Sequence, residues 1–187
     1  MRYNRDMHRR RSIRLKEYDY SQSGAYFVTI CAWNRECLFG EVVDGGIRLN
    51  ESGIIIQDIW NATPNHFQNI ELDEFIIMPN HIHGIVIIVG AQFIAPFRKT
   101  TAVKQGIMNR GVMNHAPTVG EILRAFKGRC THAINKIRNT PGIPVWQRNY
   151  YEHIVRNDSE LNSIREYIMN NPLKWDMDEN NPVNVKK

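Results

Sequence analysis

Residues 70–89, IELDEFIIMPNHIHGIVIIV, contain two runs rich in β-branched and aromatic residues, at 70–78 and 81–89. Runs of this composition are typical of β-strands. The dipeptide Pro79-Asn80 between them is typical of a tight turn. The stretch therefore predicts two neighbouring antiparallel strands, and the rest of the chain can be placed around them.

The second of these strands begins with His81-Ile82-His83. Because side chains alternate along a strand, the two histidines share one face and Ile82 points into the packed layer on the other. Two imidazoles on one face can converge on a divalent cation and leave positions open for a further ligand, water and substrate. The alternative is a pair of exposed or hydrogen-bonded histidines at a strand edge, since His-x-His is common.

The segments outside this stretch have clear local patterns. We expect strands at 24–33 and 151–156, a hairpin of 38–43 with 46–49 around Asp44-Gly45, and three helices. The helices run from 51 to before Pro64, from the capping box Thr118…Glu121, and from Asn157 or Asp158 to before Pro172. Without the hairpin, the order is βαββαβ plus a terminal helix. It predicts an α+β, ferredoxin-like fold with one antiparallel sheet and helices on one face.

The domain organisation follows from these patterns. Residues 24–175 form one predicted domain, and residues 91–117, which have no period and several Gly, Pro and Asn, form a mobile surface loop. Residues 1–23 are a basic N-terminal arm, and residues 176–187 are a polar C-terminal tail.

The positive charge is concentrated at the N-terminus. The net charge is +5, yet residues 1–16 contain seven Lys and Arg against Asp6 alone. Such an arm suits a phosphate backbone, because each neutralised phosphate releases counterions. A solvated tail that aids solubility is the alternative. The arm's candidate DNA contacts are Arg9, Arg10, Arg11 and Arg14.

Other classes of protein are disfavoured by composition. Three cysteines without CxxC spacing argue against a disulfide framework and against a thiolate zinc site. The apolar runs are too short to span a bilayer, and the charged N-terminus lacks the apolar region of a signal peptide. We therefore expect a cytoplasmic protein without a membrane partner.

The last predicted helix offers Tyr167 and, four residues later, Asn171. This spacing displays a phenol and an amide oxygen on one face, one turn apart. A half-buried helix tyrosine followed by a capping asparagine is the alternative. A phenol can act as a nucleophile, and Tyr150 and Tyr151 are the rivals of Tyr167 for that role. Neither of them has a polar metal-binding partner one helical turn away.

Further residues are candidates for DNA contact, although each has a structural alternative. The polar face of the helix after Thr118 is basic, as many solvated helix faces are. A tryptophan flanked by polar residues can stack on a base or lie in the core, and a strand histidine can face the site or simply be hydrogen-bonded. These candidates are Arg124, Lys127, Trp146, Arg148 and His153.

Four motifs in this order resemble the single-tyrosine HUH transposases, and most closely the REP-associated tyrosine transposases. They are Met78-Pro-Asn-His-Ile-His83, Trp146-Gln147, Glu152-His-Ile-Val-Arg-Asn157 and Glu166-Tyr-Ile-Met-Asn-Asn-Pro172, and the resemblance spans about 24–172. It implies a ferredoxin-like fold, Mg²⁺ or Mn²⁺, and single-stranded DNA with hairpin or palindromic elements as partner. By position it implies that His81 and His83 bind the metal, that Tyr167 is the nucleophile, and that Asn171 is a further ligand.

The resemblance implies a specific reaction. Tyr167 would attack a phosphodiester to give a 5′-phosphotyrosine and a free 3′-OH, and the reverse attack would rejoin strands. The alternatives are a relaxase- or replication-initiator-like nicking enzyme, a non-catalytic domesticated single-stranded DNA-binding protein, and an RNA-binding ferredoxin-like module. A monomer and a homodimer both remain open, and the 38–49 hairpin and the 91–117 loop have no assigned role.

Overall fold

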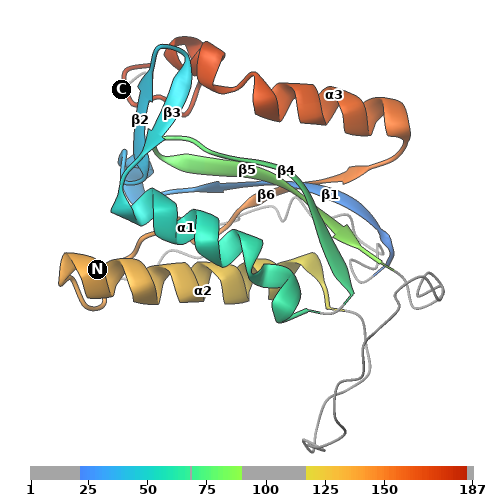
Figure 1. The fold of residues 1–187 in the computed structure, drawn as a ribbon, viewed down its shortest axis with the longest axis horizontal. Helices are drawn as coiled ribbons and strands as arrows, with labels where there is room; N and C mark the ends of the chain where they lie inside the picture. Colours follow the sequence, from blue (N-terminus) through green and yellow to red (C-terminus); the bar gives the residue numbers. More distant parts are fainter. Residues whose placement is uncertain (1–21, 68, 90–116, 185–187) are drawn as a thin grey trace, which may run out of the picture.

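The structure, a computed structural model, describes residues 22–67, 69–89 and 117–184. Its centre is an antiparallel sheet of β1 (Gly24–Cys31), β4 (Ile70–Ile77), β5 (His81–Ile88) and β6 (Tyr151–Val155), in the order β4-β5-β1-β6 (Figure 1). The first and third strands of the βαββαβ chain thus lie at the centre, which confirms the predicted ferredoxin-like α+β class. The predicted basic arm up to residue 21 and the predicted loop at 91–117, apart from its last residue, lie outside the described residues.

Two helices cover one face of the sheet, as predicted (Figure 1). They are α1 (Glu51–Asn61), which Asn50 caps by accepting from Gly53 N, and α2 (Val119–Arg138), whose capping box Thr118/Glu121 is present. The side chains between these helices and the sheet form the main core, which includes Tyr26, Val28, Ile82, Val86, Ile56, Trp60, Leu123 and Phe126. Trp60 packs so closely on β5 that a Cβ at Gly84 would lie 2.6 Å from its ring.

The third helix, α3 (Asp158–Met169), lies on the opposite face of the sheet (Figure 1). Asn157 caps it by accepting from Glu160 N at 2.9 Å. A smaller cluster joins Ile168 to Phe27 and Ile85, with Leu161 and Ile164 packed against it. The prediction of helices on one face therefore holds for α1 and α2. The terminal helix covers the other face, which carries His81 and His83, because it too has an apolar stripe to bury.

The predicted hairpin is a separate two-stranded sheet of β2 (Gly40–Val43) and β3 (Gly46–Leu49). Its turn is Asp44-Gly45, where both residues have positive φ, as a tight hairpin turn requires. Short 3₁₀ helices complete the fold: η1 (Trp33–Arg35), η2 (Thr63–Asn65) and η4 (Pro172–Met177). Pro64 and Pro172 lie in these short helices just after α1 and α3, so both prolines mark helix ends as predicted. Among the helices of the described residues, none is long and apolar enough to cross a membrane.

Candidate active site

His81 and His83 lie side by side on the face of β5 that α3 covers. Both side chains are buried, and their Nε2 atoms are 3.0 Å apart. Ile82 faces the main core on the other side of the sheet, as the alternation of a strand dictates. Two ligand atoms that each lie about 2.1 Å from one cation, at right angles to each other, are about 3.0 Å apart. The distance between the two Nε2 atoms therefore matches that of two neighbouring ligands of one octahedral ion.

Hydrogen bonds from neighbouring residues fix how the two rings are turned. Asn80 donates from Nδ2 to the carbonyl oxygens of Arg35 and Asn180, at 2.9 and 2.7 Å, so its Oδ1 is left to accept from His81 Nδ1 at 2.9 Å. On the paired strand, Thr29 lies opposite His83 and its Oγ1 is 2.8 Å from His83 Nδ1. With a proton on each Nδ1, both Nε2 lone pairs point to the same place. Metal-binding histidines are typically oriented in this way.

Both imidazoles are neutral at neutral pH. Burial is the largest cause: it lowers the pKa of His81 to about 4, with a contribution from the Arg35 charge. It lowers the pKa of His83 to about 3, with a contribution from His81. Asn171 and Asp178 oppose these shifts, at His81 and His83 respectively. Because only neutral imidazole can bind a cation, the pair is ready to act as ligand without first losing protons.

Tyr167 reaches the histidines from α3. Its hydroxyl is 3.4 Å from His83 Nε2, and its ring packs edge-on against Phe27 with centroids 6.0 Å apart. Burial raises the pKa of the phenol and Asp178 adds to the shift, whereas a hydrogen bond with Asn171 lowers it. The side chain is still 42% exposed, so a substrate can reach the oxygen.

Asn171 follows Tyr167 by one turn and lies at the start of η4. The residue is only 3% exposed, and its Oδ1 is buried with no hydrogen-bond partner among the described residues. A buried acceptor without a partner costs stability. A cation beside His81 would satisfy this oxygen, so the orphaned atom fits the ligand role expected from the sequence.

Asp178 is a residue of the site that the sequence analysis missed. One of its carboxylate oxygens is 3.8 Å from His81 Nε2, and the ligand atoms of Asp178, His81 and His83 all lie within 4.8 Å of one another. It falls in the segment interpreted as a polar tail, where no periodic pattern links an aspartate to the histidine strand. Two imidazoles, a carboxylate and an amide oxygen make a donor set that suits a divalent cation.

The segment after η4 is held against the site by main-chain contacts. Besides the bond from Asn80 to Asn180 O, Arg35 donates to Glu179 O at 2.8 Å. Asn180 N in turn donates to Asp178 Oδ1 at 2.6 Å. Asn80 therefore orients His81 and anchors the turn that presents Asp178.

A cleft of about 370 Å³ opens beside Tyr167 and His83. Tyr150 and Tyr151 also line it, so the rival tyrosines share the cleft with Tyr167. The hydroxyl of Tyr167 lies within hydrogen-bonding distance of His83 Nε2, at 3.4 Å. The remaining lining residues are Phe27, Thr29, Cys31, Gln147, Asn149, Glu179 and Asn180.

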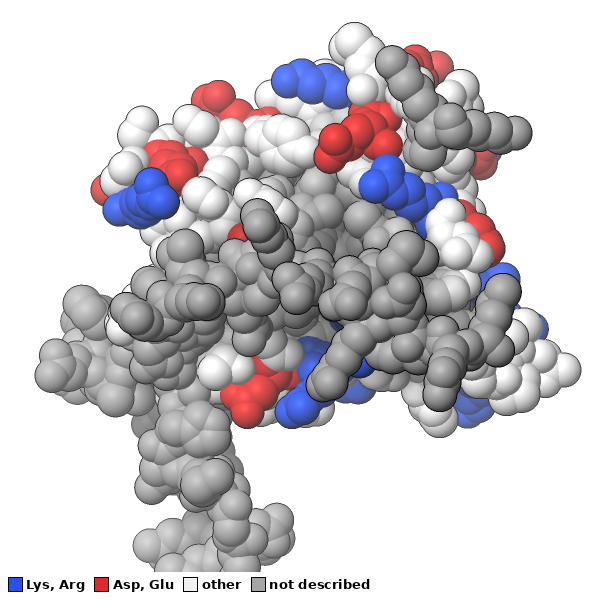
Figure 2. All heavy atoms as spheres, turned by 180° about the vertical axis from the view of Figure 1, so that it is seen from behind, with Lys and Arg blue, Asp and Glu red and all other residues white. Residues whose placement is uncertain are grey.

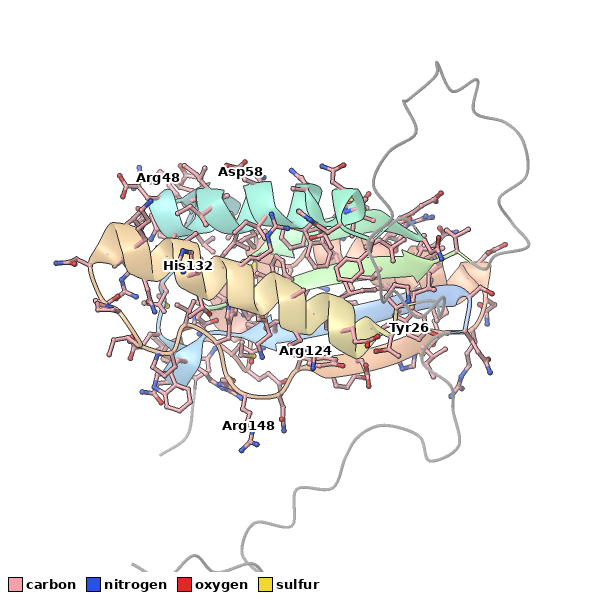
Figure 3. All side chains as sticks on the ribbon, turned by 90° about the horizontal axis from the view of Figure 1, so that it is seen from below. Tyr26, Arg48, Asp58, Arg124, His132 and Arg148 are labelled. Atoms are coloured by element: carbon pink, nitrogen blue, oxygen red, sulfur yellow. The ribbon has the colours of Figure 1, made fainter. Side chains whose placement is uncertain are left out.

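The other candidate DNA contacts lie in different environments. Arg124 and Arg148 are exposed, on α2 and on the segment after it (Figure 3). Lys127 donates from Nζ to the carbonyls of Gln147 and Arg148, and Trp146 is 5% exposed and packs in the main core. His153 contacts Glu160 at 2.8 Å. The candidates in the arm, Arg9, Arg10, Arg11 and Arg14, lie outside the described residues.

The surface of the described part carries charges of both signs. In the rear view of the molecule, acidic and basic side chains are interspersed over the described residues of the upper half (Figure 2). The basic face expected on α2 is therefore a local feature of the molecule and does not extend over its whole surface.

The fold has a counterpart among solved structures. A REP-associated tyrosine transposase, solved bound to a REP hairpin, has the same fold, with a TM-score of 0.51 and 15% sequence identity over 88% of this chain and 74% of that one. The resemblance seen in the sequence is thus confirmed as a tyrosine-transposase fold. The chain belongs to the same family as an uncharacterized protein of Haemophilus influenzae, which is 41% identical over 182 residues, covering 95% of this chain and 96% of that protein. No protein-family model matches the sequence.

Proposed function

We propose that this protein is a metal-dependent, single-tyrosine endonuclease that cuts and rejoins single-stranded DNA next to hairpins. The observation that supports this most directly is the position of Tyr167, whose hydroxyl lies 3.4 Å from Nε2 of the buried, neutral His83. Pure DNA binding would not require a nucleophile beside a ligand set. The hairpin specificity rests on the likeness to the transposase solved with a REP hairpin.

The residues present fit Mg²⁺ or Mn²⁺. His81, His83, Asp178 and Asn171 would hold the ion, and Asn171 Oδ1, which has no hydrogen-bond partner within the described part of the chain, is the atom that most needs it. When bound, such an ion polarises a phosphate oxygen and neutralises the charge that develops during attack. The pattern of Nδ1 bonds from Asn80 and Thr29 keeps both Nε2 atoms free for it.

The chain's own residues carry out the strand cut. The Tyr167 oxygen attacks the phosphorus, its proton leaves to solvent, the Tyr167 O–P bond forms and the P–O3′ bond breaks, so the leaving strand takes a proton as a free 3′-OH. The phosphodiester energy stays in the 5′-phosphotyrosine, so attack by another 3′-OH reverses the step and joins strands. The packing of Tyr167 against Phe27 holds the phenol in place for attack.

The test is cleavage of a labelled single-stranded oligonucleotide with a hairpin, in Mn²⁺ or Mg²⁺ and in EDTA. We expect cutting only with metal and a covalent protein–DNA adduct that maps by mass spectrometry to Tyr167. Tyr167→Phe should abolish the adduct. Tyr151→Phe, which removes a hydroxyl from the same cleft, is the matched control and should retain it. Hairpin binding without an adduct under any metal would instead favour a non-catalytic DNA-binding protein.

A further inference from the structure

A second and larger hollow lies on the α2 side of the sheet, away from the histidines. It is a groove of about 920 Å³ between α2 and the connector, residues 139–150, that leads from α2 to β6. Figure 3 shows the connector running alongside α2, with His132 labelled on the helix and Arg148 on the connector. Nothing in the proposed strand cut uses this groove.

The walls of the groove are held in place by side chains of α2. Asn135, which is buried, donates from Nδ2 to Ile143 O at 2.8 Å and accepts from Thr140 Oγ1 at 3.2 Å. About two turns earlier along α2, the Lys127 ammonium donates to the carbonyls of Gln147 and Arg148 at 2.6 and 3.2 Å. These bonds tie both ends of the connector to the helix, so the groove is formed before any ligand arrives.

The groove lies in the most strongly basic part of the described chain. Residues 122–151 contain six Lys and Arg and no Asp or Glu. Residues 122–151 thus have a net charge of +6, and the arm at 1–16 also has +6. Because the whole chain has a net charge of +5, all its other residues together have a net charge of −7. The lining includes Lys127, His132, Lys136 and Arg148, and a groove with this charge complements a polyanion.

Gly128 is a second, independent sign of a ligand. It lies inside α2, lines the groove, and a Cβ built on it would meet nothing within 4 Å among the described residues. Glycine in a helix interior costs about 0.5–1 kcal/mol relative to alanine. Neither packing nor backbone conformation requires glycine here, but a ligand backbone passing close to the helix would.

We propose that this groove binds the phosphodiester backbone of the DNA strand that runs on from the cleft, as a second DNA-binding surface. Gln147 lines both the groove and the cleft beside Tyr167, so one strand can pass from one to the other around this residue. The exposed Ile143 next to Pro144 offers an apolar edge for unstacked bases, which favours a single strand over a duplex. The inference rests on the proposed function, because it takes the same DNA as its ligand.

The first test measures binding at several salt concentrations, by fluorescence anisotropy with a labelled hairpin that carries a single-stranded flank. Tyr167→Phe protein is used throughout, so the DNA stays intact. Arg148→Gln and Lys136→Gln should each flatten the slope of log K against log salt by about 0.7, which is about fivefold in affinity at 0.1 M salt. Arg129→Gln removes a charge from the same helix outside the lining and should change neither value. Equal slopes for all three variants would overturn the proposal.

The second test uses Gly128→Gln, which adds a neutral, helix-favouring side chain to the groove. Its two effects should have opposite signs: the thermal midpoint rises, because a helix-interior glycine is removed, while affinity for the flanked hairpin falls. Affinity for the same hairpin without the flank should stay unchanged. A variant that is more stable and binds the flank as well as before would overturn the proposal.

The two proposals can fail separately. Cleavage by the wild-type protein together with unaltered flank binding in every groove variant overturns the groove and leaves the endonuclease. Weakened flank binding in the groove variants, with no cleavage by the wild-type protein in any metal, overturns the endonuclease and supports the groove as a DNA-binding surface.

Discussion

Arg165 of α3 binds the carboxylate of Asp73 with two nitrogens, and the Nε–Oδ1 distance is 2.7 Å. Asp73 lies where the pairing of β4 with β5 shifts register, between Leu72 and Phe75. The guanidinium beside Asp73 holds the pKa of that carboxyl below its usual range. Because Arg165 precedes Tyr167 by two residues, this pair ties the helix of the candidate nucleophile to the edge of the sheet.

We predict that Arg165→Gln and Asp73→Asn slow DNA cleavage roughly tenfold or more, since a displacement of about 1 Å at a reacting group can cost a hundredfold. Metal affinity should not change, because neither residue belongs to the ligand set. Arg48→Gln, which breaks the Arg48–Glu41 pair on the exposed hairpin, is the control and should cleave at the wild-type rate. Single-turnover rates at saturating metal measure the effect, and equal rates for all variants would contradict a positioning role.

The pH dependence of stability should report the buried histidines. Burial lowers the pKa of His81 to about 4 and of His83 to about 3, whereas in the unfolded chain both are about 6.5. Below pH 6.5 the unfolded chain therefore binds more protons, and the free energy of unfolding falls as the pH is lowered towards the folded pKa values. The loss is about 1.4 kcal/mol per pH unit for each histidine over this window. Above pH 7 both imidazoles are neutral in the folded and in the unfolded chain, so none of this stability is lost.

Chemical denaturation in EDTA between pH 4 and 8 measures this loss. His83→Asn should flatten the curve, because one of the two buried imidazoles is removed. His132→Asn changes an exposed histidine on α2 and should leave the curve as it is. A wild-type protein equally stable at pH 4.5 and 7.5 would show that the histidines are not buried in the neutral form.

The fold and the candidate site differ in how far the sequence could predict them. Local patterns specified the strands, the hairpin at Asp44-Gly45 and the capping box at Thr118, and all are present. The period of a strand predicted that His81 and His83 share a face, and the structure brings Tyr167 to that face. Asp178 could not be found in this way, because it reaches His81 through a non-local turn anchored by Asn80, which no periodicity encodes.

Asp178 gives the sharpest test of the ligand set. Asp178→Asn keeps the shape of the side chain and removes its charge, so we expect the metal concentration for half-maximal cleavage to rise by about tenfold or more. Asp176→Asn removes an exposed carboxylate two residues earlier and should have no effect. A ligand whose free concentration is 100 times its dissociation constant stabilises a fold by about 2.7 kcal/mol. The rise of the thermal midpoint in Mn²⁺ therefore measures the loss of metal affinity without DNA. Identical shifts in both variants would remove Asp178 from the site.

Thr29 should influence the affinity for the metal although it is not itself a ligand. Its hydroxyl is 2.8 Å from His83 Nδ1, where it can accept the Nδ1 proton in the tautomer that leaves Nε2 free for the cation. Thr29→Val keeps the β-branched shape that suits β1 but removes the hydroxyl, and we expect a 10- to 100-fold loss of metal affinity, the usual cost of losing such an orienting partner. Thr63→Val removes a hydroxyl that binds Ile59 O near the end of α1, far from the ligand set along the chain, and is the matched control. Metal titration by calorimetry on both variants, with circular dichroism to verify the fold, measures the difference. Wild-type affinity in Thr29→Val would mean that burial alone, without this hydrogen bond, orients the His83 ring.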